Sequence, residues 1–249
     1  MIFAESTAAA IRRLDRDQTL VIAPIAACEQ HALHLPVFTD SILVAAVAER
    51  VERVLAERTL LLPVFWLGAS EHHLAFGGTL TAKVETLQTI LVELLIPLVH
   101  DGFSRFLILN GHGGNDDPLR VALRRLDAKF PGRLWTGSSY WNLARESLAE
   151  LCDGPRKTVG HACEIETSLM LHLRPELVDR GAIADDPPTT RESLADLFCA
   201  RDFGRSTDHG AVGYPSFASA EKGRKMLAAI VDRITPIARE LIDIKLDSV

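Results

Sequence analysis

Two carboxylates and two histidines stand close together between residues 29 and 40, directly after an apolar run at residues 20–25. They are Glu29, His31, His34 and Asp40. Carboxylate and imidazole groups together suit zinc, manganese or iron, and a carboxylate such as Asp40 can bridge two ions. A buried strand that ends in a polar loop is where α/β proteins place their chemistry. The segment therefore predicts a metal site, and the alternative is a polar loop whose histidines only cap a strand.

Two further clusters carry side chains of the same kind. An apolar run at residues 106–109 leads into a glycine-rich turn that holds His112, and residues 160–168 contain His161, Glu164 and Glu166. Glycines let other groups approach the backbone closely, so the turn could cradle a phosphate. It lacks the Lys-Ser/Thr pair of a P-loop and the spacing of the dinucleotide fingerprint. We therefore interpret His112 as a metal ligand.

Strand-like and helix-like runs alternate along the chain. The predicted strands are 19–25, 59–66, 105–109 and 133–137, and the predicted helices are 40–55, 84–100, 116–129, 164–173 and 218–243. This alternation predicts an α/β fold with a mostly parallel sheet that is covered by helices on both faces. Pro97 is expected to kink or interrupt its helix. No domain boundary stands out, so residues 1–249 are expected to form one domain with a long excursion at 182–215.

The candidate ligands follow strands that are far apart in the sequence. Glu29 and His31 follow the first strand, His73 the second and His112 the third. Ligands bind outside the carboxyl ends of the strands in such a sheet. These side chains are therefore expected to meet at one edge of the sheet, which favours the metal site over the polar loop.

The bulk composition excludes several classes of protein. The net charge is −6 and no basic run could follow a nucleic-acid backbone. The chain starts without the pattern of a secretory signal, and its apolar stretches are much shorter than the roughly 20 residues that span a bilayer. Four scattered cysteines show no CxxC spacing, which argues against a zinc ribbon or a redox motif. We expect a cytoplasmic protein with no nucleic-acid or membrane partner.

The motifs, taken together and in this order, resemble the creatininase, or creatinine amidohydrolase, family. The resemblance covers most of the chain and rests on residues 29–40, 76–81, 110–115, 139–141, 161–170, 185–188 and 218–223. It implies a three-layer α/β/α fold and a centre of two divalent metal ions per subunit, with zinc, manganese or iron as the candidates. It also implies hydrolysis of a small cyclic amide or another non-peptide C–N bond, and a homo-oligomer, specifically a hexamer.

The resemblance also assigns roles to residues. Glu29 and His112 would hold one metal ion and His31 the other, with Asp40 bridging. Creatininase has a tyrosine and a ligating glutamate where this chain has Gly113 and Gly114. We expect Glu164 to supply the missing carboxylate, and the two changes argue against creatinine as the substrate.

Catalytic and substrate-binding roles follow in the same way. His161 matches a histidine that shuttles protons, and Glu166 is expected to support catalysis from behind the metal ligands. The residues expected to contact substrate are His73, Gly113, Gly114, Tyr140 and Trp141. Core packing is the alternative for Trp141.

Three other functions fit the same motifs. One is a deformylase acting on a formamide of a pyrimidine nucleotide, although Arg156 and Lys157 are the only cationic pair near the third motif. Another is a hydrolase of a modified peptide. A third, from a different class, is a non-catalytic metal-binding scaffold. The presence of candidate ligands at all five positions argues against the scaffold, because a decayed site usually loses some of them.

Overall fold

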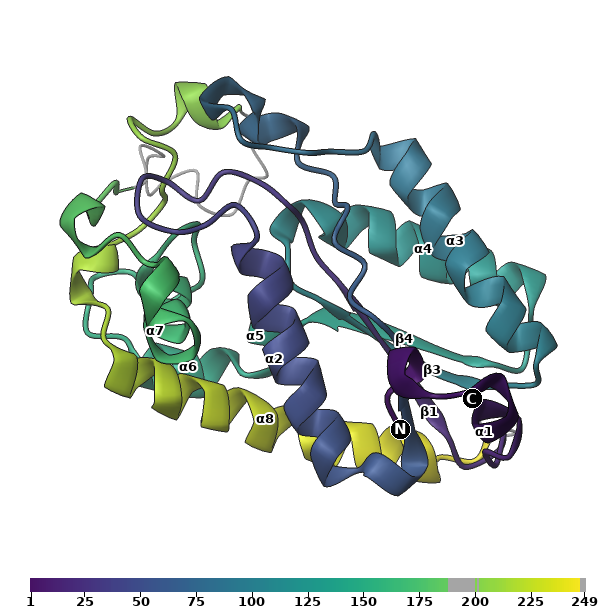
Figure 1. The fold of residues 1–249 in the computed structure, drawn as a ribbon. Helices are drawn as coiled ribbons and strands as arrows, with labels where there is room; N and C mark the ends of the chain where they lie inside the picture. The colour runs from purple at the N-terminus through teal and green to yellow at the C-terminus, as the bar shows by residue number, and fades with distance from the viewer. Residues whose placement is uncertain (188–199, 201, 247–249) are drawn as a thin grey trace.

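A computed structural model describes residues 1–187, 200 and 202–246 and contains a four-stranded parallel sheet (Figure 1). The strands are β1 (Leu20–Ile25), β2 (Thr59–Leu61), β3 (Arg105–Asn110) and β4 (Leu134–Ser139), in the spatial order β2-β1-β3-β4. β1 and β3 are buried along their whole length, as expected for central strands covered on both faces. The predicted α/β fold with a parallel sheet is confirmed.

Helices cover both faces of the sheet. The longer ones are α2 (Thr39–Val54), α3 (Val84–His100), α4 (Asp116–Lys129), α7 (Glu164–Leu173) and α8 (Ala220–Asp243). Figure 1 shows α3 and α4 on one side and α2 and α8 on the other. Alternate residues of β1 face opposite sides, so Leu20 and Ile22 pack in one core while Val21 and Ala23 pack in the other. The result is a three-layer α/β/α arrangement.

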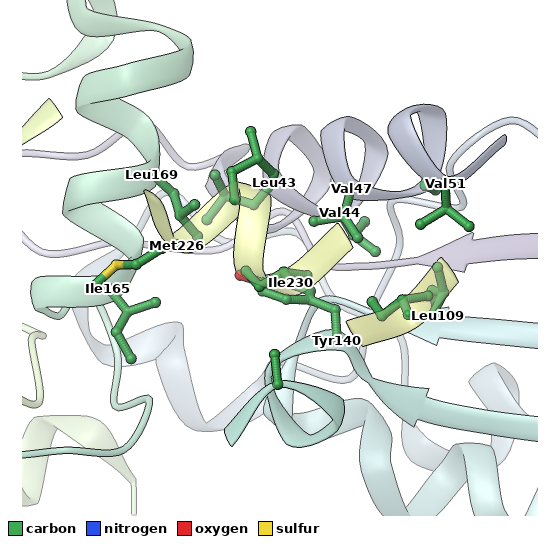
Figure 2. Packing of buried hydrophobic residues seen from close by; sticks show 14 of the residues in the cluster. Leu43, Val44, Val47, Val51, Leu109, Tyr140, Ile165, Leu169, Met226 and Ile230 are labelled. Carbon is green, nitrogen blue, oxygen red and sulfur yellow. The ribbon is translucent and has the colours of Figure 1, made fainter. Parts of the chain in front are cut away.

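The core on the α2 and α8 side also contains Tyr140 (Figure 2). This residue begins the short helix α5 (Tyr140–Leu143), and its ring lies among apolar residues of α2, α7 and α8. Only 1% of Tyr140 is exposed, and burial is the main cause that raises the pKa of its hydroxyl well above the usual value. The expectation that Tyr140 forms a wall of the substrate pocket is wrong, because its helix turns the ring into the core.

Several boundaries differ from the sequence-based expectation. β2 ends at Leu61 because Pro63 follows, although the chain stays beside β1 and the Phe65 amide donates to the Pro24 carbonyl. α3 continues through Pro97 to His100, where an interruption was expected. The sequence patterns did not reveal α1 (Ala8–Arg12) or α6 (Arg145–Leu151). Each is too short to show a clear helical period.

The excursion predicted at 182–215 is described only in part, because residues 188–199 and 201 lie outside the described residues. Its described end returns to the body of the protein, where Val212 forms an antiparallel bridge to His161 and Gly213 one to Asp186. A 3-10 helix at Phe203–Arg205 lies beside another at Glu71–Phe76. Within the described parts, no helix is long and apolar enough to cross a membrane.

Candidate metal centre

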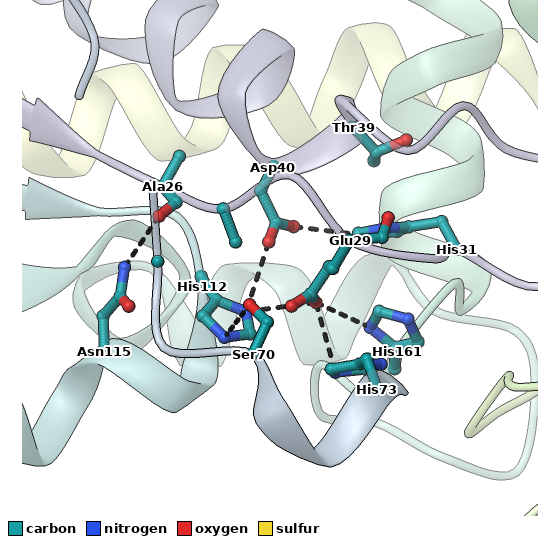
Figure 3. A network of polar contacts seen from close by, with 12 residues as sticks. Ala26, Glu29, His31, Thr39, Asp40, Ser70, His73, His112, Asn115 and His161 are labelled. Atoms are coloured by element: carbon teal, nitrogen blue, oxygen red, sulfur yellow. Dashed lines mark hydrogen bonds and ion pairs between the residues drawn. The ribbon is translucent and has the colours of Figure 1, made fainter. Parts of the chain in front are cut away.

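Four of the five predicted ligands lie together at the carboxyl edge of the sheet (Figure 3). Glu29 and His31 lie on the loop after β1, Asp40 lies in the first turn of α2, and His112 follows β3. At most 4% of any of these four residues is exposed. Four ionisable side chains are therefore buried together, and such groups remain buried only when they are paired or bind a metal.

The carboxylates and imidazoles form two groups that share Asp40. In the first, Nδ1 of His112 lies 3.1 Å from Oε1 of Glu29 and 3.2 Å from Oδ2 of Asp40. In the second, Nε2 of His31 lies 3.1 Å from Oδ1 of Asp40 and 3.9 Å from Oε1 of Glu166. Asp40 thus presents one oxygen to each group, as a bridging carboxylate would.

Several donor atoms within the two groups lack a hydrogen-bond partner. Both carboxylate oxygens of Glu29, Nε2 of His31 and Oδ2 of Asp40 are buried without a hydrogen bond among the described residues. Such atoms are rare in folded proteins and each calls for an explanation. Two ligand atoms that each lie about 2.0–2.2 Å from one ion are roughly 3–3.5 Å apart. Three of the four spacings, at 3.1–3.2 Å, match that value, and the distance from His31 to Glu166 is longer at 3.9 Å. The donor types and these spacings fit divalent metal ions.

The ring nitrogens that point away from the centre are held by the backbone. Nε2 of His112 lies 3.1 Å from the Ala69 carbonyl oxygen, and Nδ1 of His31 lies 3.1 Å from that of Glu29. A carbonyl oxygen can only accept, so each of these nitrogens carries the proton and donates it. The opposite nitrogen of each ring is then free to bind a metal, as metal-ligating histidines usually are.

Without a cation, the site holds protons more tightly than free side chains do, because the pKa values of His31 and Glu166 are raised. Burial alone would lower the pKa of His31, but the Asp40 carboxylate, with Glu166 and Glu29, raises it to about 9. Burial raises the pKa of Glu166 to about 7. The pKa of Asp40 is lowered, because neighbouring His31 and His112 outweigh the effect of burial. Metal binding at such a site displaces protons.

Two more histidines approach Glu29 from the other side. Nδ1 of His161 lies 3.6 Å and Nε2 of His73 lies 3.3 Å from Oε1 of Glu29. His161 donates through Nε2 to the backbone carbonyl of Gln30 at 2.7 Å, so its Nδ1 is free to accept a proton. Burial, followed by neighbouring histidines, lowers the pKa of both His161 and His73. Both rings are therefore neutral near pH 7.

The two glutamates at the start of α7, Glu164 and Glu166, do not lie where their expected roles would place them. The carboxylate of Glu164 accepts from the backbone amides of Asp153 and Gly154, each at 2.9 Å, and pairs with Lys222 at 2.6 Å. Oε2 of Glu166 accepts from the Cys163 amide, while its Oε1 faces His31. Glu164 as a metal ligand is therefore contradicted, and Glu166 joins His31 and Asp40 in a candidate ligand group.

The reason is helix geometry. Successive residues of an α-helix are turned by about 100°, so side chains two positions apart point about 200° away from each other. Only one of Glu164 and Glu166 can face the site. The sequence signal that could have selected Glu166 is the capping box, in which the third helical residue folds back over the helix start. His34, in the first cluster, turns away to the Thr167 hydroxyl at 2.8 Å.

Two adjoining cavities open onto the centre. The smaller, of about 220 Å³, is lined by Glu29, Asp40, His112 and Glu166 and also by Trp141 and Gly113. The larger, of about 830 Å³, is lined by His73, His112, His161, Gly113 and Gly114 among others. His73, Gly113, Gly114 and Trp141 are thus brought to the cavities as expected. His72, which the sequence did not single out, also lines the larger cavity and stacks on His112 at 5.7 Å between ring centroids.

Gly113 and Gly114 differ in the space around them. A Cβ at position 113 would meet no atom within 4 Å. A Cβ at position 114 would lie 2.3 Å from the Ala69 carbonyl oxygen and 2.5 Å from Nε2 of His112. Position 114 in this chain therefore has no room for a side chain, whereas position 113 opens directly into the cavities.

Known proteins are similar to this chain over nearly its whole length. The family model for creatininase, described as creatinine amidohydrolase, matches residues 4–237. A mycofactocin precursor peptide peptidase of Mycobacterium ulcerans (strain Agy99) is 31% identical over 238 residues, covering 88% of this chain and 84% of that protein. A creatinine amidohydrolase of Pseudomonas putida is 30% identical over 243 residues, covering 92% of each chain.

Solved structures agree with the sequence relatives. A manganese form of creatininase superposes with a TM-score of 0.83 at 26% identity and covers 98% of this chain and 99% of that chain. The family model and the sequence relatives cover nearly the whole chain, and the solved structure shares its fold. This protein belongs to the creatininase family of amidohydrolases.

Proposed function

We propose that this protein is a dinuclear metal-dependent amidohydrolase that acts on a C–N bond other than an ordinary peptide bond. The observation that carries the proposal is the buried pair of ligand groups that share Asp40, with donor atoms that lack other partners. Glu29, Asp40 and His112 would hold one ion, and His31, Asp40 and Glu166 the other. The mixture of carboxylate and imidazole suits zinc, manganese or iron.

Divalent ions at these positions would acidify a bound water and polarise the carbonyl oxygen of the amide. The side chains of the protein must then handle protons and position the substrate. In hydrolysis, the water oxygen forms a bond to the carbonyl carbon, the C–N bond breaks, and a proton passes to the leaving nitrogen. Neutral His161, with its free Nδ1 beside Glu29, is placed to accept the proton of the water and deliver it to that nitrogen.

Glu29 and His73 support this proton transfer. Nδ1 of His73 lies 2.7 Å from the side-chain nitrogen of Gln30, which can only donate. His73 is therefore the tautomer with its proton on Nε2, which faces Glu29. This places an N–H group of His73 3.3 Å from Oε1 of Glu29. Trp141 and the bare backbone at Gly113 line the space where the substrate would lie.

The size of the cavities bears on the substrate. A volume of about 830 Å³ beside the centre lies in the upper part of the range for small-molecule sites. It favours a substrate larger than a single small ring and makes a modified peptide the second candidate, in keeping with the peptidase among the relatives. For the nucleotide deformylase, Arg156 would not bind the phosphate, because it donates to the carbonyl oxygens of Thr158 and Val159 in its own loop.

Metal analysis followed by a substrate panel tests the proposal. The purified chain is expected to carry about two transition-metal ions per subunit and to lose hydrolytic activity on chelation, with recovery on addition of Zn²⁺ or Mn²⁺. The panel should contain cyclic amides, formamides and modified peptides. Absence of metal, with no uptake on titration, would refute the proposed centre. Metal without hydrolysis of any panel member would instead favour a non-catalytic scaffold.

A further inference from the structure

A third cavity adjoins the candidate metal centre behind Trp141. It has a volume of about 180 Å³ and shares Trp141, Asn142 and Val159 with the smaller cavity at the centre. Two cationic side chains, Arg145 and Lys157, also line it. The mechanism proposed above uses neither of them. A substrate with its amide at the metal centre could therefore extend past Trp141 to these two cations.

Arg145 and Lys157 keep most of their hydrogen-bond donors. Arg145 donates to the side-chain oxygen of Asn142 at 3.2 Å, and Lys157 donates to the Cys152 carbonyl at 2.6 Å. Among the described residues, neither has a carboxylate within 4.0 Å. A guanidinium has five N–H donors and an ammonium three, so both groups can still bind an anion.

Part of the wall of the third cavity is apolar. Leu148 and Ile165 line the third cavity together with the Trp141 ring. Such walls suit the carbon skeleton that would join an amide to an anionic group. A planar guanidinium matches the two oxygens of a carboxylate or phosphate better than a single ammonium does.

Among the described residues, the large cavity at the centre is lined by acidic side chains and by no lysine or arginine. Glu71, Asp117 and Asp202 line the large cavity. An anionic group would be repelled there and attracted to the side of Arg145 and Lys157. The charge distribution therefore gives the substrate a direction across the metal centre.

We propose that Arg145 and Lys157 form a subsite for an anionic group, a carboxylate or a phosphate, on the substrate of this enzyme. The inference rests on the proposed amidohydrolase function and specifies its substrate class. The subsite would distinguish amides that carry a negative charge a few bonds from the scissile C–N bond from neutral amides of the same shape.

Matched substrates test the subsite in the metal-loaded protein. Three versions of each panel amide that is hydrolysed should be compared, with a carboxylate, a phosphate or a neutral carboxamide at the distal end. Arg145→Gln and Lys157→Gln are each expected to lower kcat/KM about 10-fold for the preferred anionic version, mainly through KM, since 1.4 kcal/mol corresponds to a factor of ten. Turnover of the carboxamide version should stay unchanged.

Lys129→Gln is the matched control. It removes the same charge, but Lys129 is the last residue of α4, whereas the centre lies near the start of that helix. Whichever of the carboxylate and phosphate versions loses more kcat/KM in the Arg145 and Lys157 variants carries the anionic group that the subsite prefers. Equal losses for charged and neutral versions, or no loss for either anionic version, would overturn the subsite.

A binding measurement separates failure of the subsite from failure of the proposed function. Titration calorimetry should compare N-acetylphenylalaninate, phenyl phosphate and N-acetylphenylalaninamide, using wild type and the Arg145→Gln/Lys157→Gln double variant. Tighter binding of an anion by wild type only would support the subsite even if no amide is hydrolysed. Equal binding of all three probes by both proteins would refute it even if the enzyme is active.

Discussion

In the proposed centre Asp40 would bind both metal ions, because its two oxygens face different ligand groups. Asp40→Asn is therefore expected to lose both ions, whereas Glu166→Gln should lose one and keep about one per subunit. Elemental analysis of the purified variants measures this difference. Glu164→Gln is the matched control, since it makes the same chemical change two residues from Glu166 and should retain the wild-type metal content. Metal loss in Glu164→Gln but not in Glu166→Gln would show that the assignment of the two glutamates is reversed.

Glu164 has a structural role that predicts a different phenotype. Its carboxylate, 3% exposed, satisfies two backbone amides and pairs with Lys222 from α8. Replacing the carboxylate with an amide leaves the two backbone amides and Lys222 with a weaker acceptor, and such a loss costs about 1–3 kcal/mol of stability. We expect the free energy of unfolding of Glu164→Gln to fall by that amount in urea titrations. A Lys222→Met variant should lose less than Glu164→Gln, because the two backbone amides keep their acceptor. An unchanged stability of Glu164→Gln would show that these contacts contribute nothing.

The residues of the centre show what the sequence could and could not predict. Glu29, His31, Asp40 and His112 were predictable because each follows a strand or begins a helix, and parallel strands bring such positions to one edge. Glu164 and Glu166 were not, since the choice depends on which helix face turns inward. Tyr140 and Trp141 present the same problem. Both begin α5, but Tyr140 lies within the core, whereas Trp141 packs against that core and also lines the cavity.

At the scale of elements, the glycine-rich turn between β3 and α4 restricts which ligands the site can use. In the proposed centre Glu166 of α7 would supply the carboxylate that the turn lacks at position 114. The turn of this chain has no room for a side chain at that position, because atoms of Ala69, His112 and His72 all lie within 3 Å of a Cβ built there. Long elements such as β1 and β3 were predictable from their hydrophobic runs. The lack of room at position 114 was not predictable, because it depends on contacts with Ala69 and with His72 of the 3-10 helix at Glu71–Phe76.

The closed turn gives a prediction at the same scale. Gly114→Glu restores the carboxylate that creatininase has at this position, yet it should abolish metal binding at the His112 group, because the new side chain displaces His112. Metal content and kcat measure the effect. Gly113→Ala is the control, since its Cβ meets no atom within 4 Å, and it should keep both ions. A Gly114→Glu protein with full metal content and activity would show that the turn adapts easily.

At the scale of the whole molecule, we expect the chain to assemble into a homo-oligomer, with a hexamer as the specific expectation. The described surface has exposed apolar side chains near the site, including Leu33, Leu74 and Leu80 at 62%, 52% and 56% exposure. Apolar side chains gathered on a surface often mark contacts between subunits. Light scattering at micromolar concentration measures the assembly. Leu33→Glu should weaken it, while Val54→Glu at the far end of α2 should not. A monomeric wild-type protein would contradict the prediction.

Substrate choice is also a property of the whole molecule, because it depends on the combined shape of the cavities around the centre. The resemblance to creatininase implies that this chain lacks an aromatic side chain at Gly113. In the proposed centre, Glu166 of α7 would supply the carboxylate that the turn lacks at Gly114. The metal ions supply general reactivity, while contacts in the transition state determine specificity. Hydrolysis can therefore persist in a cavity that no longer fits creatinine closely.

We accordingly expect creatinine to be a poor substrate, with kcat/KM at least about 100-fold below that of the best amide in the panel. Gly113→Tyr tests the physical reason, because position 113 opens into the cavities and has room for a ring. If the missing aromatic group limits creatinine binding, this variant should raise kcat/KM for creatinine and lower it for the larger panel substrates, with metal content unchanged. Gly113→Leu, which adds bulk without a hydroxyl or an aromatic face, should lower turnover of the larger substrates without the gain for creatinine. Wild-type turnover of creatinine equal to that of the best panel amide would show that the residue at position 113 does not control specificity.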